Sequence, residues 1–314
     1  MDRPTMTVKL DIGDMVVLIA APRLEVIAHV RDRYHAFLSD EKPDFEIEMA
    51  LAEDVDVAGF LGVPREILLE PVRRGSYPRA AENWGRGPGP GTESADSQTA
   101  SKPHVAHLDG LILLQRSDFA GCLDLTARRG KNIFGKNMGP FAVESFLRIA
   151  YSFLAVDRGG LLLHSAGVLR DGRGYIFPGQ SGTGKSTIAS LATPTEAVLS
   201  DEMVVVRKGG DGYLVYSTPF FGTNPSAGRN IAAPLRAAFL PVKDQAVYLK
   251  EARPAQALAK LLAGVLFFGQ EPALNRRLVD IGADVVARVP FYELHFRRDG
   301  SFWECIGALE KTEV

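Results

Sequence analysis

Residues 174–187 read GYIFPGQSGTGKST, a short apolar run followed by a glycine-rich loop. The loop at residues 179–186 matches the pattern G-x-x-x-x-G-K-[ST] at every fixed position. This pattern predicts a strand at residues 175–178 and a helix at residues 185–191. Glycines let the backbone turn tightly around a phosphate group, and the start of the following helix adds partial positive charge. We therefore expect a nucleotide-binding loop.

We expect two side chains of this loop to contact the phosphates or the metal ion directly. Lys185 supplies a full positive charge to the terminal phosphates, and Ser186 is placed to hold Mg²⁺ that also shares phosphate oxygens. A glycine-rich turn that binds nothing is the alternative, and the complete motif in its strand-to-helix context argues against it. The residues expected to contact the nucleotide are Gly179, Gln180, Ser181, Gly182, Thr183, Gly184, Lys185, Ser186 and Thr187.

The apolar run at residues 197–199 is followed by Ser200 and then by an acidic pair, Asp201-Glu202. A carboxylate at the end of a strand beside a phosphate loop can hold the metal ion or orient the nucleophile. We therefore take both residues as candidate catalytic groups and Asp201 also as a metal ligand. The alternative is a solvated strand end that happens to be acidic.

Two further residues are candidates for the catalytic site. His164 lies in a predicted strand at residues 161–169, and a tight turn at Asp171-Gly172 would fold this strand against the one that enters the loop. A histidine in an apolar strand is also a common core residue. Arg229 follows the run NPSAG at residues 224–228 and could reach a transferring phosphate from a flexible loop.

The pattern His164-x-x-x-Val168, then GYIFPGxSGxGKS at residues 174–186, then an acidic pair, resembles the catalytic domain of the HPr kinase/phosphorylase family. The close resemblance covers residues 161–206. It implies a phosphoenolpyruvate-carboxykinase-like nucleotide fold. It also implies transfer of phosphate from ATP to a serine of a small protein.

On this resemblance Lys185 and His164 would be active-site residues, and Ser186 would bind Mg²⁺. The family's proton-accepting aspartate is replaced here by Glu202, which is longer by one methylene. The family's downstream Leu-Glu-Ile-Arg-Gly signature has no counterpart, since the comparable region reads STPFFGT at residues 217–223. These departures favour the broader HPr-kinase-like group, whose members accompany peptide or cofactor biosynthesis.

The rest of the chain predicts an N-terminal α+β region at residues 1–130 and a kinase-like domain at residues 131–314. Between residues 84 and 103, twelve of twenty residues are Gly, Pro, Ser or Thr, which predicts a mobile loop. Other patterns predict individual elements. They are a helix at 24–38, strands at 45–51, 108–114 and 122–127, a helix from Pro140 to Gly159, a hairpin of 203–207 with 213–217, a helix at 254–268, and a hairpin of 291–296 with 302–306.

The composition limits the possible partners. With 36 basic and 38 acidic residues the chain has no strong field for nucleic acid. The longest early apolar run, residues 15–21, is far shorter than the ~20 residues of a membrane span, so we expect no membrane segment and no signal peptide. Two cysteines make neither a disulfide framework nor a zinc site, which fits the cytoplasm. Nothing in the pattern selects an oligomeric state.

The sequence therefore predicts an α/β P-loop kinase of phosphoenolpyruvate-carboxykinase-like type with a mixed sheet, preceded by an α+β region. We expect it to use ATP and Mg²⁺ to phosphorylate a hydroxyl, with a serine of a small protein or peptide as the acceptor. A small-molecule kinase on the same fold is one alternative. A non-catalytic ATP-sensing regulatory module is another, and the placement of Glu202 as a base distinguishes it from an enzyme.

Overall fold

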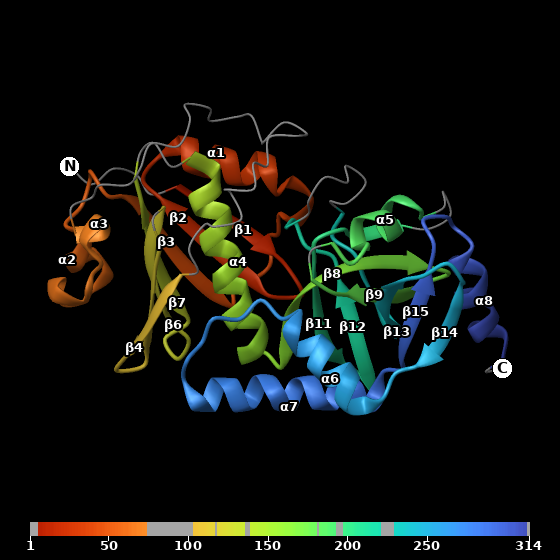
Figure 1. Ribbon diagram of the computed structural model, residues 1–314. Helices are drawn as coiled ribbons and strands as arrows, with labels where there is room; N and C mark the ends of the chain where they lie inside the picture. Colours follow the sequence, from red (N-terminus) through yellow and green to blue (C-terminus); the bar gives the residue numbers. More distant parts are fainter. Residues whose placement is uncertain are drawn as a thin grey trace. The chain divides into compact units, whose positions relative to one another are not determined.

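The computed structural model describes residues 6–73, 103–116, 118–135, 139–180, 182–192, 197–220 and 229–312. The chain forms two compact units, Met1–Leu154 with Phe268–Glu271 and Ala155–Phe267 with Pro272–Val314. Each unit is built on a mixed sheet with helices (Figure 1), so the α/β class expected from the sequence is confirmed. Residues 84–102 of the expected mobile loop lie outside the described residues.

The first unit contains a mixed sheet that has seven strands over the described residues. Across the sheet the order is β1 (Met6–Asp11), β2 (Val16–Ala21), β3 (Phe45–Leu51), β7 (Arg129–Phe134), β6 (Phe119–Asp124), β5 (Leu111–Gln115) and β4 (His104–Leu108). The ladders β2–β3 and β3–β7 are parallel and the others are antiparallel. Its helical segments are α1 (Leu24–Arg33), η1 (His35–Phe37), α2 (Val57–Leu61), η2 (Arg65–Ile67), α3 (Glu70–Arg73) and most of α4 (Gly139–Asp157).

Two strand predictions in this unit had the wrong bounds. Residues 108–114 span the last residue of β4, a turn and most of β5, because Asp109 and Gly110 have positive φ angles of 44° and 85° and reverse the chain there. The following strand is β6 and ends at Asp124, whose carboxylate accepts the N–H of Ala127 and starts a turn. Local turn chemistry therefore overrides the apolar run in both places.

The boundary expected after residue 130 falls inside β7, which pairs with β3 and β6 in the first sheet. The division between the units lies at Leu154, near the end of α4. The predicted helix from Pro140 is confirmed as α4, and Gly159 follows it with a φ of 73°.

The second unit contains a mixed sheet with eight strands in the part of the chain that the structure describes. Seven of them follow the order β10 (Ala197–Ser200), β8 (Gly160–Arg170), β11 (Met203–Gly209), β12 (Gly212–Tyr216), β13 (Ala232–Lys243), β15 (Phe291–Phe296) and β14 (Tyr248–Glu251). The eighth, β9 (Arg173–Pro178), pairs antiparallel with β8 and parallel with β13. The predicted hairpin of β8 and β9 is confirmed, with Asp171 and Gly172 at φ angles of 49° and 73°.

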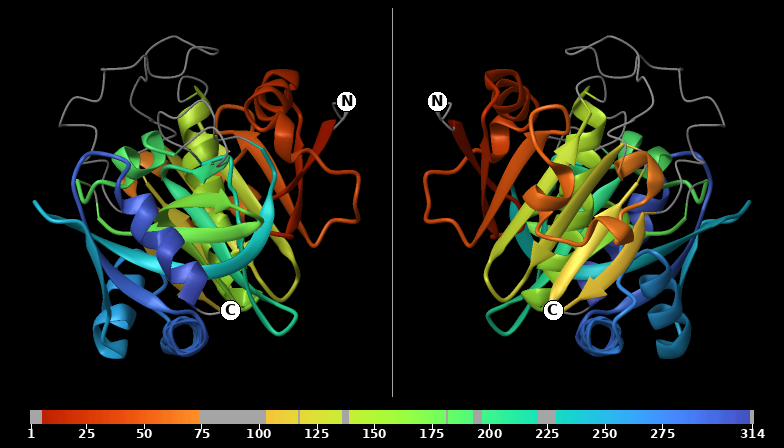
Figure 2. Two further views of the ribbon diagram at one scale, coloured as in Figure 1. Left: turned by 90° about the vertical axis from the view of Figure 1, so that its right-hand side faces the viewer. Right: turned by 90° about the vertical axis from the view of Figure 1, so that its left-hand side faces the viewer.

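Helices cover both faces of the second sheet (Figures 1 and 2). In the described residues these helices are α5 (Lys185–Ser190), α6 (Pro254–Ala263), α7 (Pro272–Arg288) and α8 (Phe302–Thr312). Leu161 and Leu163 of β8 belong to the apolar cluster with α6 and α7, whereas Ala166 and Val168 belong to the cluster with α5 and α8. Among the helices of the described residues, none has the length and apolar content needed to cross a membrane.

Two predictions in the second unit need correction. The predicted helix at residues 254–268 is present as α6 but ends at Ala263, because Leu266 donates its N–H to the carbonyl of Leu162 and the chain joins β8 there. Residues 302–306 belong to a helix and not to a hairpin. Phe302, Trp303 and Ile306 are buried at helical spacing, which a five-residue window cannot distinguish from a strand.

Candidate functional site

The glycine-rich loop connects the end of β9 to the start of α5, as the pattern predicts. Gly182 and Gly184 have φ angles of 81° and 108°, a region in which other residues are strained. The hydroxyl of Thr183 donates to the carbonyl of Gln180 over 2.9 Å and closes a turn within the loop. Ser181 lies outside the described residues. The backbone thus has the tight curvature that a phosphate cradle requires.

Lys185 is held within this loop. Its ammonium nitrogen Nζ donates to the carbonyls of Gly179, over 2.8 Å, and Gln180, over 2.9 Å, and the residue is 5% exposed. Because an ammonium has three N–H donors, these bonds to described residues leave one donor for an incoming acceptor. Burial lowers the pKa of Lys185, and the negative charge of Glu202 partly opposes that shift. Glu202 is therefore within electrostatic reach of the loop lysine.

Ser186 and Thr187 occupy the first turn of α5. Ser186 is exposed and Thr187 is half-buried. In the described residues, no three His, Cys, Asp or Glu side chains gather into a metal site made of protein ligands alone. A metal ion at this position would therefore need ligands from the bound nucleotide as well.

The acidic pair lies between β10 and β11, which both pair antiparallel with β8. Strand β10 pairs with residues 167–169 of β8, and β11 pairs with residues 160–164. The pairing register shifts between Val198 and Ser200, and Asp201 and Glu202 follow in a bend before β11 begins. Such irregularities re-aim side chains and are frequent beside active sites. Asp201 is buried at 3% exposure, whereas Glu202 is half-buried. The two carboxylates therefore have different environments.

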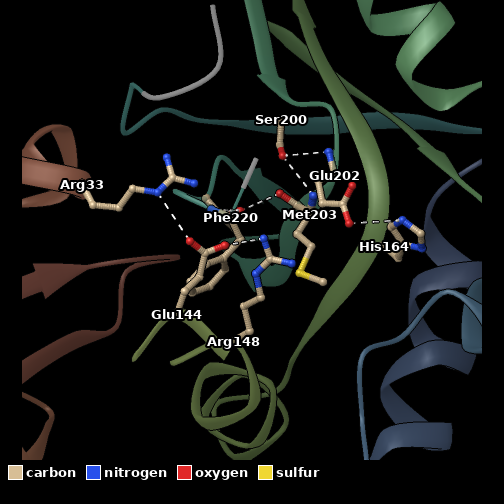
Figure 3. A network of polar contacts seen from close by, with 9 residues as sticks. Arg33, Glu144, Arg148, His164, Ser200, Glu202, Met203 and Phe220 are labelled. Carbon is tan, nitrogen blue, oxygen red and sulfur yellow. Dashed lines mark hydrogen bonds and ion pairs between the residues drawn. The ribbon is translucent and has the colours of Figure 1, made fainter. Parts of the chain in front are cut away.

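His164 lies beside Glu202 (Figure 3). The distance between Nε2 of His164 and Oε1 of Glu202 is 3.6 Å, and both side chains are partly exposed. Met203 is the partner of His164 in the ladder of β8 and β11, which fixes the two strands at this point. A protonated imidazole would form an ion pair with the carboxylate, so the two side chains can orient each other.

Backbone hydrogen bonds connect these residues to the loop. The carbonyl of His164 accepts the N–H of Gly179 over 3.3 Å, and the N–H of His164 donates to the carbonyl of Gly264 over 2.7 Å. The N–H of Ser165 donates to the carbonyl of Glu202 over 3.0 Å. The structure therefore brings together the loop, His164 and Glu202, all within the second unit.

Arg229 is not brought to this cluster. It is exposed just before β13, and its carbonyl accepts a hydrogen bond from the hydroxyl of Ser217 over 2.6 Å. Within the residues that the structure describes, no hydrogen bond or ion pair joins its guanidinium to the loop or to Glu202. Residues 224–228, which precede it, lie outside the description.

Two buried hydroxyls beside the acidic pair had no role in the sequence analysis. The Oγ atom of Ser200 accepts the N–H groups of Glu202, over 3.2 Å, and Met203, over 3.0 Å. The hydroxyl of Thr218 donates to the carbonyl of Met203 over 2.7 Å. A serine immediately before an acidic pair is a signal for such a turn, because its hydroxyl can accept backbone N–H groups a few residues ahead.

The model of the family described as SynChlorMet cassette protein ScmC matches residues 136–311, more than half of the chain. The chain belongs to the ScmC family. The ScmC match includes the loop, His164, the acidic pair and the two buried hydroxyls. No curated protein is significantly similar to the chain.

Membership of the ScmC family corrects the expected relationship to HPr kinase/phosphorylase. That resemblance depended chiefly on the loop at residues 179–186, on His164 and on the acidic pair. The loop pattern is imposed by the way a backbone wraps a phosphate, so it recurs in many nucleotide-binding families. What HPr kinase phosphorylates, and with which residues, is therefore no evidence about this ScmC protein.

Proposed function

We propose that the second unit binds Mg·ATP through residues 179–187 and transfers the γ-phosphoryl group to a hydroxyl. The observation that carries this proposal is the joint placement of Lys185, Glu202 and His164. A loop with its lysine supports nucleotide binding alone. A partly exposed carboxylate within reach of that lysine adds a candidate proton acceptor, and this favours an enzyme over an ATP-sensing module.

The described residues of the loop fit a polyphosphate. A Cβ at Gly182 would meet no atom within 4 Å, so open space adjoins the backbone there, and Lys185 keeps a donor for a phosphate oxygen. The exposed hydroxyl of Ser186 and the carboxylate of Asp201 are oxygen ligands of the kind that Mg²⁺ prefers. We assign these two residues to the metal ion. When bound, Mg·ATP supplies the transferable phosphoryl group.

Each side chain of the cluster has a distinct task. Lys185 neutralises charge on the phosphates, and its two bonds to loop carbonyls hold it in place. Oε1 of Glu202 lies 3.6 Å from Nε2 of His164, and we assign to the Glu202 carboxylate the task of accepting the proton of the acceptor hydroxyl. His164 orients that carboxylate. Positioning and charge stabilisation thus account for most of the proposed catalysis.

The surroundings of the loop strand support the phosphoenolpyruvate-carboxykinase-like type of P-loop fold. In this type the loop follows an antiparallel hairpin, whereas an ordinary P-loop strand has parallel neighbours. Here β9 is antiparallel to β8 and parallel to β13. We infer this finer fold from the mixed pairing.

We also infer a cytoplasmic protein whose acceptor is a serine of a small protein or peptide. Cys122 is buried, Cys305 is half-buried and both are free, as a reducing compartment would allow. A small-molecule hydroxyl is the alternative acceptor. Labelled ATP offered with small proteins, peptides and hydroxylated metabolites would separate the two, according to which class gains the label.

Nucleotide binding and phosphate release test the proposal. Lys185→Ala should weaken Mg·ATP binding in calorimetry by at least ~10-fold and remove most phosphate release from γ-labelled ATP. Lys208→Ala is the matched control, because Lys208 is an exposed lysine of β11 that pairs with Asp284. This control should bind and turn over Mg·ATP as the wild type does. A wild-type protein that binds no ATP at millimolar nucleotide with Mg²⁺ would refute the proposal.

A further inference from the structure

The chain around Glu202 is held by side chains where the backbone ladders are incomplete. The ladder between β11 and β12 ends at the pair Val205 and Tyr216. Two residues further along each strand, the same register sets Met203 opposite Thr218. There the hydroxyl of Thr218 donates to the carbonyl of Met203 over 2.7 Å. A buried side chain therefore takes the place of the next ladder bond.

On the other side of the acidic pair, Ser200 performs the complementary task. Its Oγ atom accepts the N–H of Met203 over 3.0 Å and the N–H of Glu202 over 3.2 Å. Met203 is therefore fixed at its amide by Ser200 and at its carbonyl by Thr218 (Figure 3 shows the Ser200 bonds). The residue before Met203 is Glu202, so the two hydroxyls define the backbone from which its carboxylate projects.

Both hydroxyls are completely buried, since Ser200 and Thr218 are each 0% exposed. Water therefore cannot replace either one without a rearrangement, and a buried polar group left without a partner is costly. Removal of a hydroxyl would release the backbone of the acidic pair from its present geometry. The loop has its own anchor, the bond from the N–H of Gly179 to the carbonyl of His164.

We propose that Ser200 and Thr218 are positioning residues that aim the carboxylate of Glu202 at the acceptor hydroxyl. This inference rests on the proposed phosphoryl transfer. Proton transfer requires a carboxylate within hydrogen-bond reach, and a misplacement of ~1 Å can cost ~10²-fold in rate. Loss of either hydroxyl should therefore lower kcat and leave the binding of Mg·ATP unchanged.

The first test compares substitutions that differ by one hydroxyl. Thr218→Val and Ser200→Ala should lower kcat for phosphate release from Mg·ATP by ~10–100-fold, with KM within ~2-fold of the wild type. Thr218→Ser keeps the hydroxyl and should restore most of kcat. Ser152→Ala is the matched control. Ser152 is another buried serine, whose hydroxyl donates to the carbonyl of Ile149 within α4, and its loss should leave both constants unchanged.

The second test asks whether the hydroxyls act through Glu202. In a Glu202→Gln background, Thr218→Val and Ser200→Ala should add little to the loss that Glu202→Gln causes. Equal losses in both backgrounds, or a KM that rises as kcat falls, would overturn the inference and leave the hydroxyls as structural groups. A Thr218→Val variant with wild-type kcat would overturn it alone. A wild type without Mg·ATP turnover would overturn the proposed function together with it.

Discussion

The ring of Phe296 lies against the backbone of Gly184, so that a Cβ added to this glycine would stand 2.6 Å from the ring carbon Cζ. Gly184 has a φ of 108° and directly precedes Lys185 at the start of α5. Phe296 ends β15 and contacts Phe302 of α8, with ring centroids 5.9 Å apart. Gly184 is therefore required both for its backbone conformation and for the closeness of the ring.

Substitution of this glycine should damage the loop more than substitution of its neighbour. Gly184→Ala should destabilise the protein by ~2–4 kcal/mol, because left-handed strain of ~1–2 kcal/mol adds to overpacking against Phe296. Gly182 also has a positive φ, of 81°, but a Cβ added there would meet no atom within 4 Å. Gly182→Ala should therefore lose stability only through the backbone strain. Urea denaturation and calorimetry with Mg·ATP measure both effects. Equal destabilisation by the two variants would contradict the importance of the ring contact.

The acidic pair should separate into two roles. Glu202→Gln should lower turnover by ~10²–10⁴-fold and leave nucleotide affinity nearly unchanged, as expected for the loss of a general base. Asp201→Asn should instead raise the Mg²⁺ concentration needed for half-maximal activity. Steady-state kinetics over a Mg²⁺ series distinguish the two. If both variants lose activity equally at every Mg²⁺ concentration, the assignment of roles is wrong.

The buried ammonium of Lys185 should give the protein a specific pH dependence. Its pKa is lowered in the folded state, chiefly by burial, from an ordinary value of 10.5. At pH values between the lowered pKa of the folded state and 10.5, the unfolded chain binds more protons than the folded chain. The free energy of unfolding should therefore rise as pH rises through this range. Lys185→Met should remove this part of the dependence, and the control Lys208→Met should keep it. Urea denaturation without nucleotide measures it, and identical pH profiles for Lys185→Met and wild type would disprove the effect.

A carboxylate in the first unit should matter for stability. Glu144 accepts from Arg148 over 2.5 Å and from Arg33 over 3.4 Å (Figure 3). Glu144→Gln should cost ~1–3 kcal/mol, because the partly buried guanidinium groups lose their countercharge. Burial lowers the pKa of His29 and Glu144 opposes this, so that pKa should fall further in the variant, as NMR titration can follow. Glu25→Gln, at an exposed site in α1, should change neither quantity.

The parts of the site that depend on local chemistry could be predicted from the sequence. The pattern at residues 174–187 specifies strand, loop and helix because glycine spacing and the phosphate cradle are local features. The turn at Asp171-Gly172 is equally local, and its two positive φ angles follow from residue type. The hairpin then carries His164 toward the loop. These inferences needed no knowledge of distant contacts.

Other features depend on contacts between distant residues. Thr218 bonds to Met203 only because β11 and β12 pair in one register. No spacing of residues in the sequence predicts that hydrogen bond. Phe302 and Trp303 fit a short strand as well as a helix until burial against the sheet decides between them. The family expectation failed for a related reason, since a phosphate loop identifies a chemical task more specifically than it identifies ancestry.

The contact of Phe296 with Gly184 also has a consequence during synthesis. The ribosome releases the loop that contains Gly184 well before the strand that carries Phe296. At ~5–20 residues per second this interval is on the order of ten seconds. A nascent chain therefore holds an unsupported loop for that time, and premature termination before β15 would yield a fragment that carries the complete motif without the ring beneath it.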